Sequence, residues 1–235
     1  MIRPNRNARA TFLVAALAAT FLWLAMLGPA WAGLCGDDVA GARVPCACGD
    51  VVVSDTRLSA DDPIATGRCM GDGLSVRAPS GATSIVLDLA GHSILGSGVG
   101  VGVRVVRGGS DGAVVVGDGR SDGVAVVGGF GTGFKSTGRR ELREVRGLVL
   151  RGNGENGLVV RGDGPRIVDV TSENNGRDGV HAGGRAPVLE NVSSEGNGRV
   201  GVRVTAPGAE IDARADENAR GDIVTSPRAR AGEQR

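Results

Sequence analysis

The chain has 235 residues, 41 of them Gly and 9 Pro, and its 27 Lys and Arg nearly balance its 26 Asp and Glu. Glycine at this level without a Gly-X-Y period excludes collagen. A hydrophobic content of 41% is too high for a wholly disordered chain. The near-zero net charge gives no reason to expect a nucleic-acid partner.

Residues 1–32 are typical of a secretory signal peptide. Three arginines precede an apolar run at 11–27, and the small-x-small cleavage site Ala30-Trp31-Ala32 follows it. The alternative is an uncleaved membrane anchor, for which the apolar run is at the short end. We expect cleavage after Ala32, no membrane span in the mature chain, and a secreted or periplasmic location. Both Trp leave with this segment and the chain has no Tyr, so we expect an aliphatic core.

Four cysteines follow at the start of the mature chain: Cys35, Cys46, Cys48 and Cys69. An even number in an exported chain indicates disulfides. Of the three pairings, we favour Cys35–Cys46 with Cys48–Cys69, because Cys46 and Cys48 are too close in sequence to pair comfortably. The alternative is a zinc site, but no His lies in the cluster. We expect residues 33–50 to form a disulfide-stapled N-terminal segment.

Downstream of the cysteines, Val-rich runs alternate with Gly-rich turns, which is typical of short strands. The predicted strand regions are 73–78, 84–96, 101–108, 112–119 and 123–130. Three carboxylates lie in the turns of this part, at Asp111, Asp118 and Asp122. Turn carboxylates at such spacing can bind Ca²⁺, whereas Asp-Gly is also a common turn dipeptide. Calcium is therefore a weak candidate, and we expect no other cofactor and no resident metal.

A repeat of 22 residues begins at Gly157, Gly179 and Gly201. Its segments lack apolar residues at helical spacing and are bounded by Gly, Asn and Asp, so we expect three short strands per repeat. Such units bury a continuous core only when they stack. The columns that repeat are Val145, Ile167, Leu189 and Ile211; Leu148, Val170 and Val192; and Asn153, Asn175, Asn197 and, one residue short, Asn218.

Stacking places the equivalent residues of neighbouring repeats about 4.8 Å apart. The aliphatic columns then fill the core, and the Asn column forms a ladder of side-chain amides. The alternative for the Asn column is ordinary turn preference. We expect about seven coils over residues 51–224, followed by a flexible tail at 225–235.

Three segments carry a resemblance to a known family. Cys48–Leu58 (CGDVVVSDTRL), Gly67–Val76 (GRCMGDGLSV) and Leu87–Gly98 (LDLAGHSILGSG) resemble secreted bacterial right-handed parallel β-helix proteins of the pectate-lyase-like superfamily. One branch comprises the periplasmic accessory proteins of nitrous oxide reductase. The chain departs from the family at Ala90, where Asn is more usual. The resemblance implies an all-β fold, a right-handed parallel β-helix, but no single chemistry.

Asp88 and His92 lie within the third of these segments. They are an acid/base pair or, as the resemblance to a structural signature of the group favours, turn residues that join two early coils. The copper chemistry associated with the accessory branch finds few ligands here, which are Met70, His92, His181 and the cysteines. Copper delivery is therefore the function we favour least.

Gly157, Gly179 and Gly201 are the anchor glycines of the repeat. His181 and Arg203 occupy one column with Val159, in the strand that follows each anchor Gly. Alternation turns this column outward and its flanking residues inward. In polysaccharide lyases of this architecture, a basic residue on such a face removes a proton α to a carboxylate. His181 and Arg203 are therefore our catalytic candidates, and the alternative is a solvated strand face.

Two functions of different classes follow. We favour a non-enzymatic scaffold or surface module that binds polysaccharide. The alternative is a polysaccharide lyase, hydrolase or epimerase. The sequence leaves the oligomeric state open.

Overall fold

The computed structural model describes residues 33–119 and 123–226. The predicted signal peptide, Asp122 and the residues after Ser226 lie outside this part. The described residues are almost entirely strand and turn, with one four-residue helix, α2 (Pro63–Thr66). The predicted all-β class is confirmed. No helix in the described part combines the length and apolarity that a membrane crossing needs.

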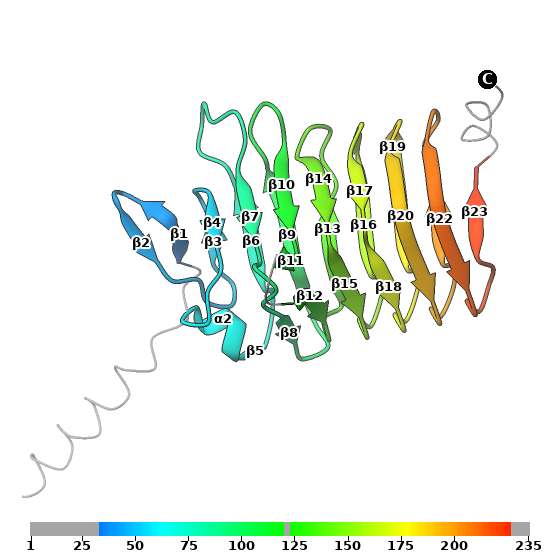
Figure 1. The fold of residues 1–235 in the computed structure, drawn as a ribbon, viewed down its shortest axis with the longest axis horizontal. Coiled ribbons are helices and arrows are strands. Elements are labelled where there is room, and N and C mark those ends of the chain that lie inside the picture. The colour runs from blue at the N-terminus through cyan, green and yellow to red at the C-terminus, as the bar shows by residue number, and fades with distance from the viewer. Residues whose placement is uncertain (1–32, 120–122, 227–235) are drawn as a thin grey trace, which may run out of the picture. The chain divides into compact units, whose positions relative to one another are not determined.

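The strands form two sheets (Figure 1). The first, sheet A, contains in spatial order β2 (Ala42–Val44), β1 (Leu34–Val39), β3 (Val51–Val52), β6 (Leu74–Arg77), β9 (Val101–Arg107), β13 (Thr132–Ser136), β16 (Leu158–Asp163), β19 (Val180–Arg185), β21 (Val202–Val204) and β23 (Ile223–Thr225). Its neighbours are parallel except for the β1–β2 pair.

The second sheet has two arms that meet at the long strand β20 (Val188–Glu195). The arm that we call ladder B contains β4 (Thr56–Arg57), β7 (Val86–Asp88), β10 (Ala113–Val116), β14 (Leu142–Arg146) and β17 (Arg166–Val168). The arm that we call ladder C contains β5 (Arg68–Cys69), β8 (Ile94–Gly96), β12 (Gly123–Gly128), β15 (Leu148–Arg151) and β18 (Thr171–Glu173). Beside them, β22 (Glu210–Asp216) pairs with β20, and β11 (Asp118–Gly119) pairs with β12 in antiparallel fashion.

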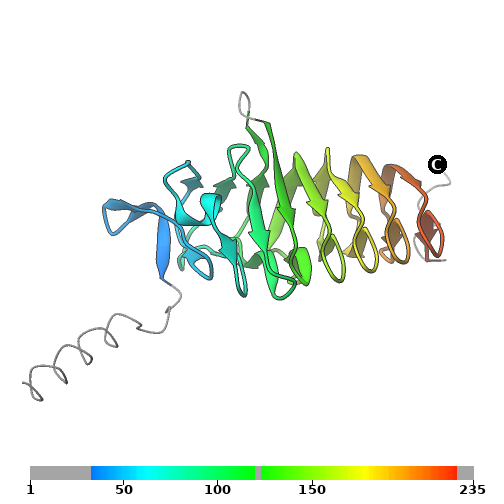
Figure 2. The same cartoon turned by 90° about the horizontal axis from the view of Figure 1, so that it is seen from below.

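The chain visits sheet A, ladder B and ladder C in turn, and each such circuit adds one strand to each. After β16, for example, it forms β17 and β18 and then returns to sheet A as β19, beside β16. Figure 2 shows successive circuits side by side. Val159 lies opposite His181, and His181 opposite Arg203. The register of these circuits therefore follows the 22-residue repeat.

The core lies between sheet A and the two ladders and is aliphatic. In sheet A the residues that flank the outward column are buried, as in Leu158, Val180 and Val202, each of which has no exposed surface. Ile167 and Leu189 are buried on ladder B. Strand alternation therefore turns the predicted columns inward, except at Ile211 in the last full circuit, which is 37% exposed.

The asparagine column forms a continuous hydrogen-bonded ladder at the corner between ladder C and sheet A. Asn153 donates its Nδ2 to Asn175 Oδ1 at 2.9 Å, and Asn175 donates to Asn197 Oδ1 at 3.0 Å. Asn197 donates to Asn218 Oδ1 at 2.9 Å. The same oxygens accept the backbone N–H of the preceding Asn, for example Asn153 N at 3.0 Å. Each amide therefore joins two circuits.

The anchor glycines are required because the ladder lies against them. A Cβ on Gly179 would overlap Ser194 Oγ and would lie 2.7 Å from Asn197 Nδ2. The same atoms of the preceding circuit, from Ser172 and Asn175, face Gly157. The repeating Gly is thus fixed by close approach rather than by a left-handed backbone.

Two disulfides stabilise the N-terminal end. They join Cys35 to Cys46 and Cys48 to Cys69, the pairing that we favoured. Cys35, Cys46 and Cys69 are buried with the first core residues. Because β1 pairs in parallel with β3 and in antiparallel fashion with β2, residues 33–50 extend sheet A by two strands.

Candidate functional site

The outward column of sheet A is longer than the repeat indicated. Toward the N-terminal end of sheet A, the register continues from Arg203 and His181 through Val159 to Lys135 and then to Arg104. Val159 is 8% exposed, so this part of the face is partly covered. The predicted neighbours His181 and Arg203 are therefore brought together, and two further cations share their column. The repeat missed Lys135 and Arg104 because their circuits contain longer loops.

Arg203 is held by a buried carboxylate. Its Nε donates to Asp178 Oδ2 at 2.8 Å, and its Nη2 donates to Asp178 Oδ1 at 3.4 Å. The Asp178 side chain is only 5% exposed, against 24% for Arg203. Burial raises the pKa of Asp178, but the hydrogen bonds from Arg203 and Val200 N and the charges of Arg203 and Arg199 outweigh it. The pKa therefore lies below its ordinary value.

His181 is partly buried and surrounded by cations. Burial lowers the pKa of its imidazole, and the charge of Arg161 lowers it further. The charge of Asp178 opposes this shift, whereas Arg203 and Arg199 add to it. The net direction is downward, which favours a neutral imidazole near pH 7. A neutral imidazole is able to accept a proton.

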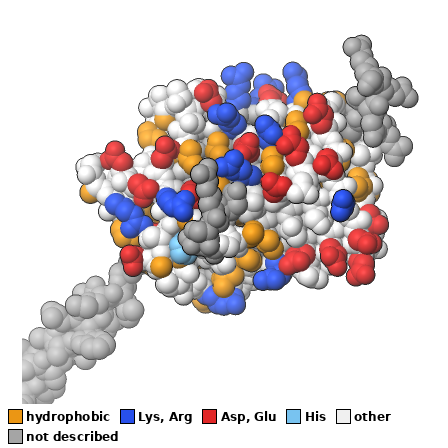
Figure 3. All heavy atoms as spheres, viewed as in Figure 1, with side chains coloured by type: hydrophobic (Ala, Val, Ile, Leu, Met, Phe, Trp, Pro, Cys, Tyr) orange, Lys and Arg blue, Asp and Glu red, His pale blue; other side chains and the backbone are white. Residues whose placement is uncertain are grey.

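Beside this column lies a hollow at the corner where the chain leaves sheet A for ladder B. It has a volume of about 290 Å³ and is open to solvent. Its lining residues are Thr137, Arg139, Arg161, Gly162, Asp163, Gly184 and Arg185. In Figure 3, Lys and Arg side chains gather at the upper edge, over the loops that follow the strands of sheet A. We call the hollow that is lined by these seven residues the arginine hollow.

Two of the lining residues, Gly162 and Gly184, are glycines. Gly184 has a φ of +98°, and a Cβ there would lie 2.6 Å from Gly162 N. Neither residue projects a side chain into the hollow, so the surrounding arginines line open space. The stem of Arg161 lies over Gly183, where an added Cβ would meet Arg161 Cγ at 3.3 Å.

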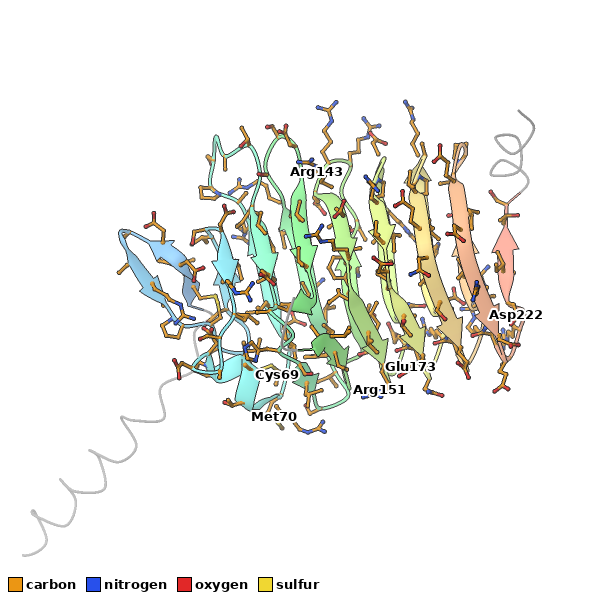
Figure 4. All side chains as sticks on the ribbon, viewed as in Figure 1. Cys69, Met70, Arg143, Arg151, Glu173 and Asp222 are labelled. Atoms are coloured by element: carbon orange, nitrogen blue, oxygen red, sulfur yellow. A yellow bond between two sulfur atoms is a disulfide. The ribbon has the colours of Figure 1, made fainter. Side chains whose placement is uncertain are left out.

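On each ladder, one arginine is paired with a carboxylate of a neighbouring circuit. On ladder C, Arg151 bonds to Glu173 at 3.3 Å, and these side chains lie on neighbouring strands in Figure 4. On ladder B, Arg166 bonds to Glu190 at 2.8 Å. Within the described residues, Arg139, Arg161 and Arg185 have no such ion pair. The arginine hollow therefore gathers three arginines without a carboxylate partner in one place.

Asp88 and His92 lie on either side of the turn at residues 90–91. Asp88 Oδ1 accepts from Ala90 N at 2.8 Å, and Asp88 also pairs with Arg57. The described structure contains no hydrogen bond between the side chains of Asp88 and His92. These contacts support the turn role rather than an acid/base pair.

Of the three candidate calcium ligands, only the side chain of Asp111 lies in the described part. Asp111 is exposed and accepts a hydrogen bond from Ser110 Oγ. Asp118 lies in β11, its side chain is outside the described atoms, and Asp122 is not described. Among the described residues, no group of three His, Cys, Asp or Glu could hold a metal ion. Met70 is 81% exposed, beside the Cys48–Cys69 bond.

The residues that the sequence analysis missed carry weaker signals. Asp178 precedes an anchor Gly, as Asn156 does one circuit earlier, and Asn156 Oδ1 accepts from Asp178 N at 3.2 Å. A polar residue at this position was therefore a usable signal. The arginine hollow carries no such signal in the sequence. Arg139 belongs to an irregular circuit, and Arg161 and Arg185 occupy different positions of the repeat.

No family model, curated protein or solved structure matches the chain.

Proposed function

We propose that the protein is a secreted right-handed parallel β-helix. Support for the helix is the order in which the chain visits sheet A, ladder B and ladder C while each strand pairs in parallel with its equivalent one circuit on. Support for the hand is that crossovers between parallel strands are right-handed in nearly all proteins. Support for export is the pair of disulfides, which persist in oxidising compartments.

We further propose that this β-helix is a surface module that binds polysaccharide. The observation that carries this proposal is the cationic face formed by the outward column of sheet A and the arginine hollow. Its column carries donors at Arg104 and Lys135 in two successive circuits and at His181 and Arg203 in two more, on either side of Val159. Equivalent positions of this kind suit a linear polymer with repeating units. Apart from Arg139, its cations lie on strands of sheet A, which lowers the ordering cost of binding.

The test is a binding screen of the mature protein on neutral and acidic polysaccharides, with and without Ca²⁺. We expect retention on at least one polymer, weakened by Lys135→Ala. Thr171→Ala, at a half-buried position on ladder C, is the matched control and should retain binding. Absence of retention on every polymer would refute the binding function.

A second candidate is a polysaccharide lyase that uses His181. The observation that favours it is a neutral imidazole next to a guanidinium. A base of this kind contributes roughly 10²–10⁴-fold. Against it, Arg203 is already bound by Asp178. The test is the ultraviolet absorbance of unsaturated uronate released from pectin, alginate or hyaluronan. We expect none from the wild type, whereas release that His181→Ala abolishes would establish the lyase.

A further inference from the structure

Backbone hydrogen bonds hold together the segments that carry the arginines of the hollow. Asp163 N donates to Arg139 O at 2.7 Å, and Gly164 N donates to Arg185 O at 2.8 Å. These backbone bonds fix Arg139 and Arg185 to the end of β16, the strand that carries Arg161. Glu141 accepts from Thr137 N and Gly138 N at 3.3 and 2.7 Å and so closes the loop that presents Arg139.

The charges of the hollow do not cancel. Asp163 is its only carboxylate, against three guanidinium groups. Asp163 lies in register with Arg185, but the described residues show no ion pair between them. An anion that enters the hollow therefore meets a net positive charge, with the Thr137 hydroxyl as a neutral donor.

We propose that the arginine hollow is a subsite for a tetrahedral oxyanion, a sulfate or phosphate group carried by a glycan. This assignment rests on the proposed polysaccharide-binding function and names its ligand class. A guanidinium presents a planar fork of donors that matches such oxygens in pairs. A carboxylate has two oxygens and satisfies one fork, whereas a sulfate or phosphate group has enough oxygens to accept from several arginines. Three arginines around one hollow therefore favour the tetrahedral group.

The probes are dextran, dextran sulfate and dextran phosphate, which share one neutral backbone, together with polygalacturonate. Binding is measured by calorimetry at constant ionic strength. We expect the wild type to bind the sulfated or the phosphorylated polymer and not dextran, and the two charged polymers identify which group is preferred. Polygalacturonate should bind more weakly.

Variants locate the binding. Arg139→Ala, Arg161→Ala and Arg185→Ala should each weaken binding roughly tenfold or more, the loss expected for a hydrogen bond to a charged group. Arg214→Ala removes the same charge from an exposed position on β22 and should change binding less than about twofold. Arg161→Lys keeps the charge but removes the fork, so it should restore only part of the loss. Asp163→Asn should strengthen binding.

The outcomes separate this proposal from the broader one. If the wild type binds no polymer, the binding function fails as well. If it binds dextran or polygalacturonate and the hollow variants bind as well as Arg214→Ala, only the oxyanion subsite is refuted. Binding to phosphatidylglycerol vesicles through the same arginines, without binding to dextran sulfate or phosphate, would also refute a glycan ligand. Thermal unfolding by circular dichroism verifies that each variant is folded.

Discussion

Asn175 is 2% exposed and uses both ends of its amide. Its Nδ2 donates to Asn197 Oδ1 and to Leu150 O, both at 3.0 Å, and its Oδ1 accepts from Asn153. A single side chain thus satisfies groups of three circuits. Because a buried amide without partners is costly, this position contributes more to stability than an ordinary turn Asn does.

Asn175→Ala should lower the free energy of unfolding by at least about 2 kcal/mol, since it leaves buried groups on both neighbours unpaired. Asn218→Ala, at the partly exposed end of the ladder, should cost less because water replaces the lost bonds. Urea unfolding followed by circular dichroism measures both. Equal losses below about 0.5 kcal/mol would support simple turn preference instead.

The pKa of His181 provides a second test at the residue scale. The chain has two His, so its imidazole resonances are simple to follow by NMR. We expect His181 to titrate below the ordinary value of about 6.5. Arg161→Ala should raise its pKa, because the charge of Arg161 lowers it in the wild type. An unchanged pKa in that variant would place Arg161 too far away to act.

The same shift predicts how stability depends on pH. Because the folded-state pKa of His181 is lowered, the unfolded chain takes up a proton first as the pH falls through about 6.5. Unfolding is then favoured, and the free energy of unfolding decreases until the pH passes the folded-state pKa. His181→Gln should reduce this decrease, as urea midpoints at several pH values would show.

At the scale of elements, the anchor glycines couple strand to ladder. Gly179→Ala should destabilise the protein by about 3 kcal/mol, because its Cβ would displace Ser194 and Asn197 in a packed interior. Gly71→Ala is the control, since nothing lies within 4 Å of its added Cβ and its φ is not left-handed. Thermal unfolding should separate the two variants clearly. Equal melting temperatures would contradict the close approach.

The disulfides stabilise the end of the molecule where circuits are irregular. We expect no free thiol in the mature protein, and a reduction cost of roughly 2–5 kcal/mol. Hydrogen exchange should rise first in β1, β3 and β6, because both bonds lie in this part. Uniform acceleration along the chain would indicate that the disulfides stabilise the whole molecule instead.

The predicted strands agree with the structure where a run is bounded by turns. Residues 73–78 contain β6, 101–108 contain β9 and 123–130 contain β12. Alternation of apolar residues and a fixed period suffice to predict the positions of these strands. They also suffice to predict that His181 lies opposite Arg203. The arginine hollow was not predictable in this way. It depends on loop conformation between sheet A and ladder B and on which carboxylates are already paired, neither of which a period encodes.

At the scale of the whole molecule, the two halves differ in regularity. Leu74 lies opposite Val103, and Phe134 opposite both Val103 and Leu158, so the earlier circuits vary in length. From Leu158 onward the register follows the repeat. Charge is also distributed unevenly, since Figure 3 shows Asp and Glu gathering at the lower right, over the ends of β20 and β22. The cationic face spans both parts of the molecule, since Arg104 and Lys135 lie in the irregular circuits and His181 and Arg203 lie in the regular ones.

If the regular part is a solenoid, one whole circuit should be removable. Deleting residues 179–200 joins Asp178 to Gly201, which takes the place of Gly179 as the anchor. In the stacked columns, Val202 then lies next to Leu158 and Ile211 next to Ile167. Asn218 becomes the ladder partner of Asn175. Because the lost circuit contacts chiefly its two neighbours, we expect a folded β protein that is less stable by a few kcal/mol.

The control deletes half a circuit, residues 179–189. It brings the part of β20 that pairs with ladder C against sheet A and turns Val192 outward, so it should abolish cooperative unfolding. Circular dichroism with urea unfolding compares the two deletions. If both lose the transition alike, the repeats do not stack as equivalent units, and the β-helix is refuted. If the full-circuit deletion folds, it also lacks Gly184 and Arg185, so its affinity for dextran sulfate should fall with that of Arg185→Ala.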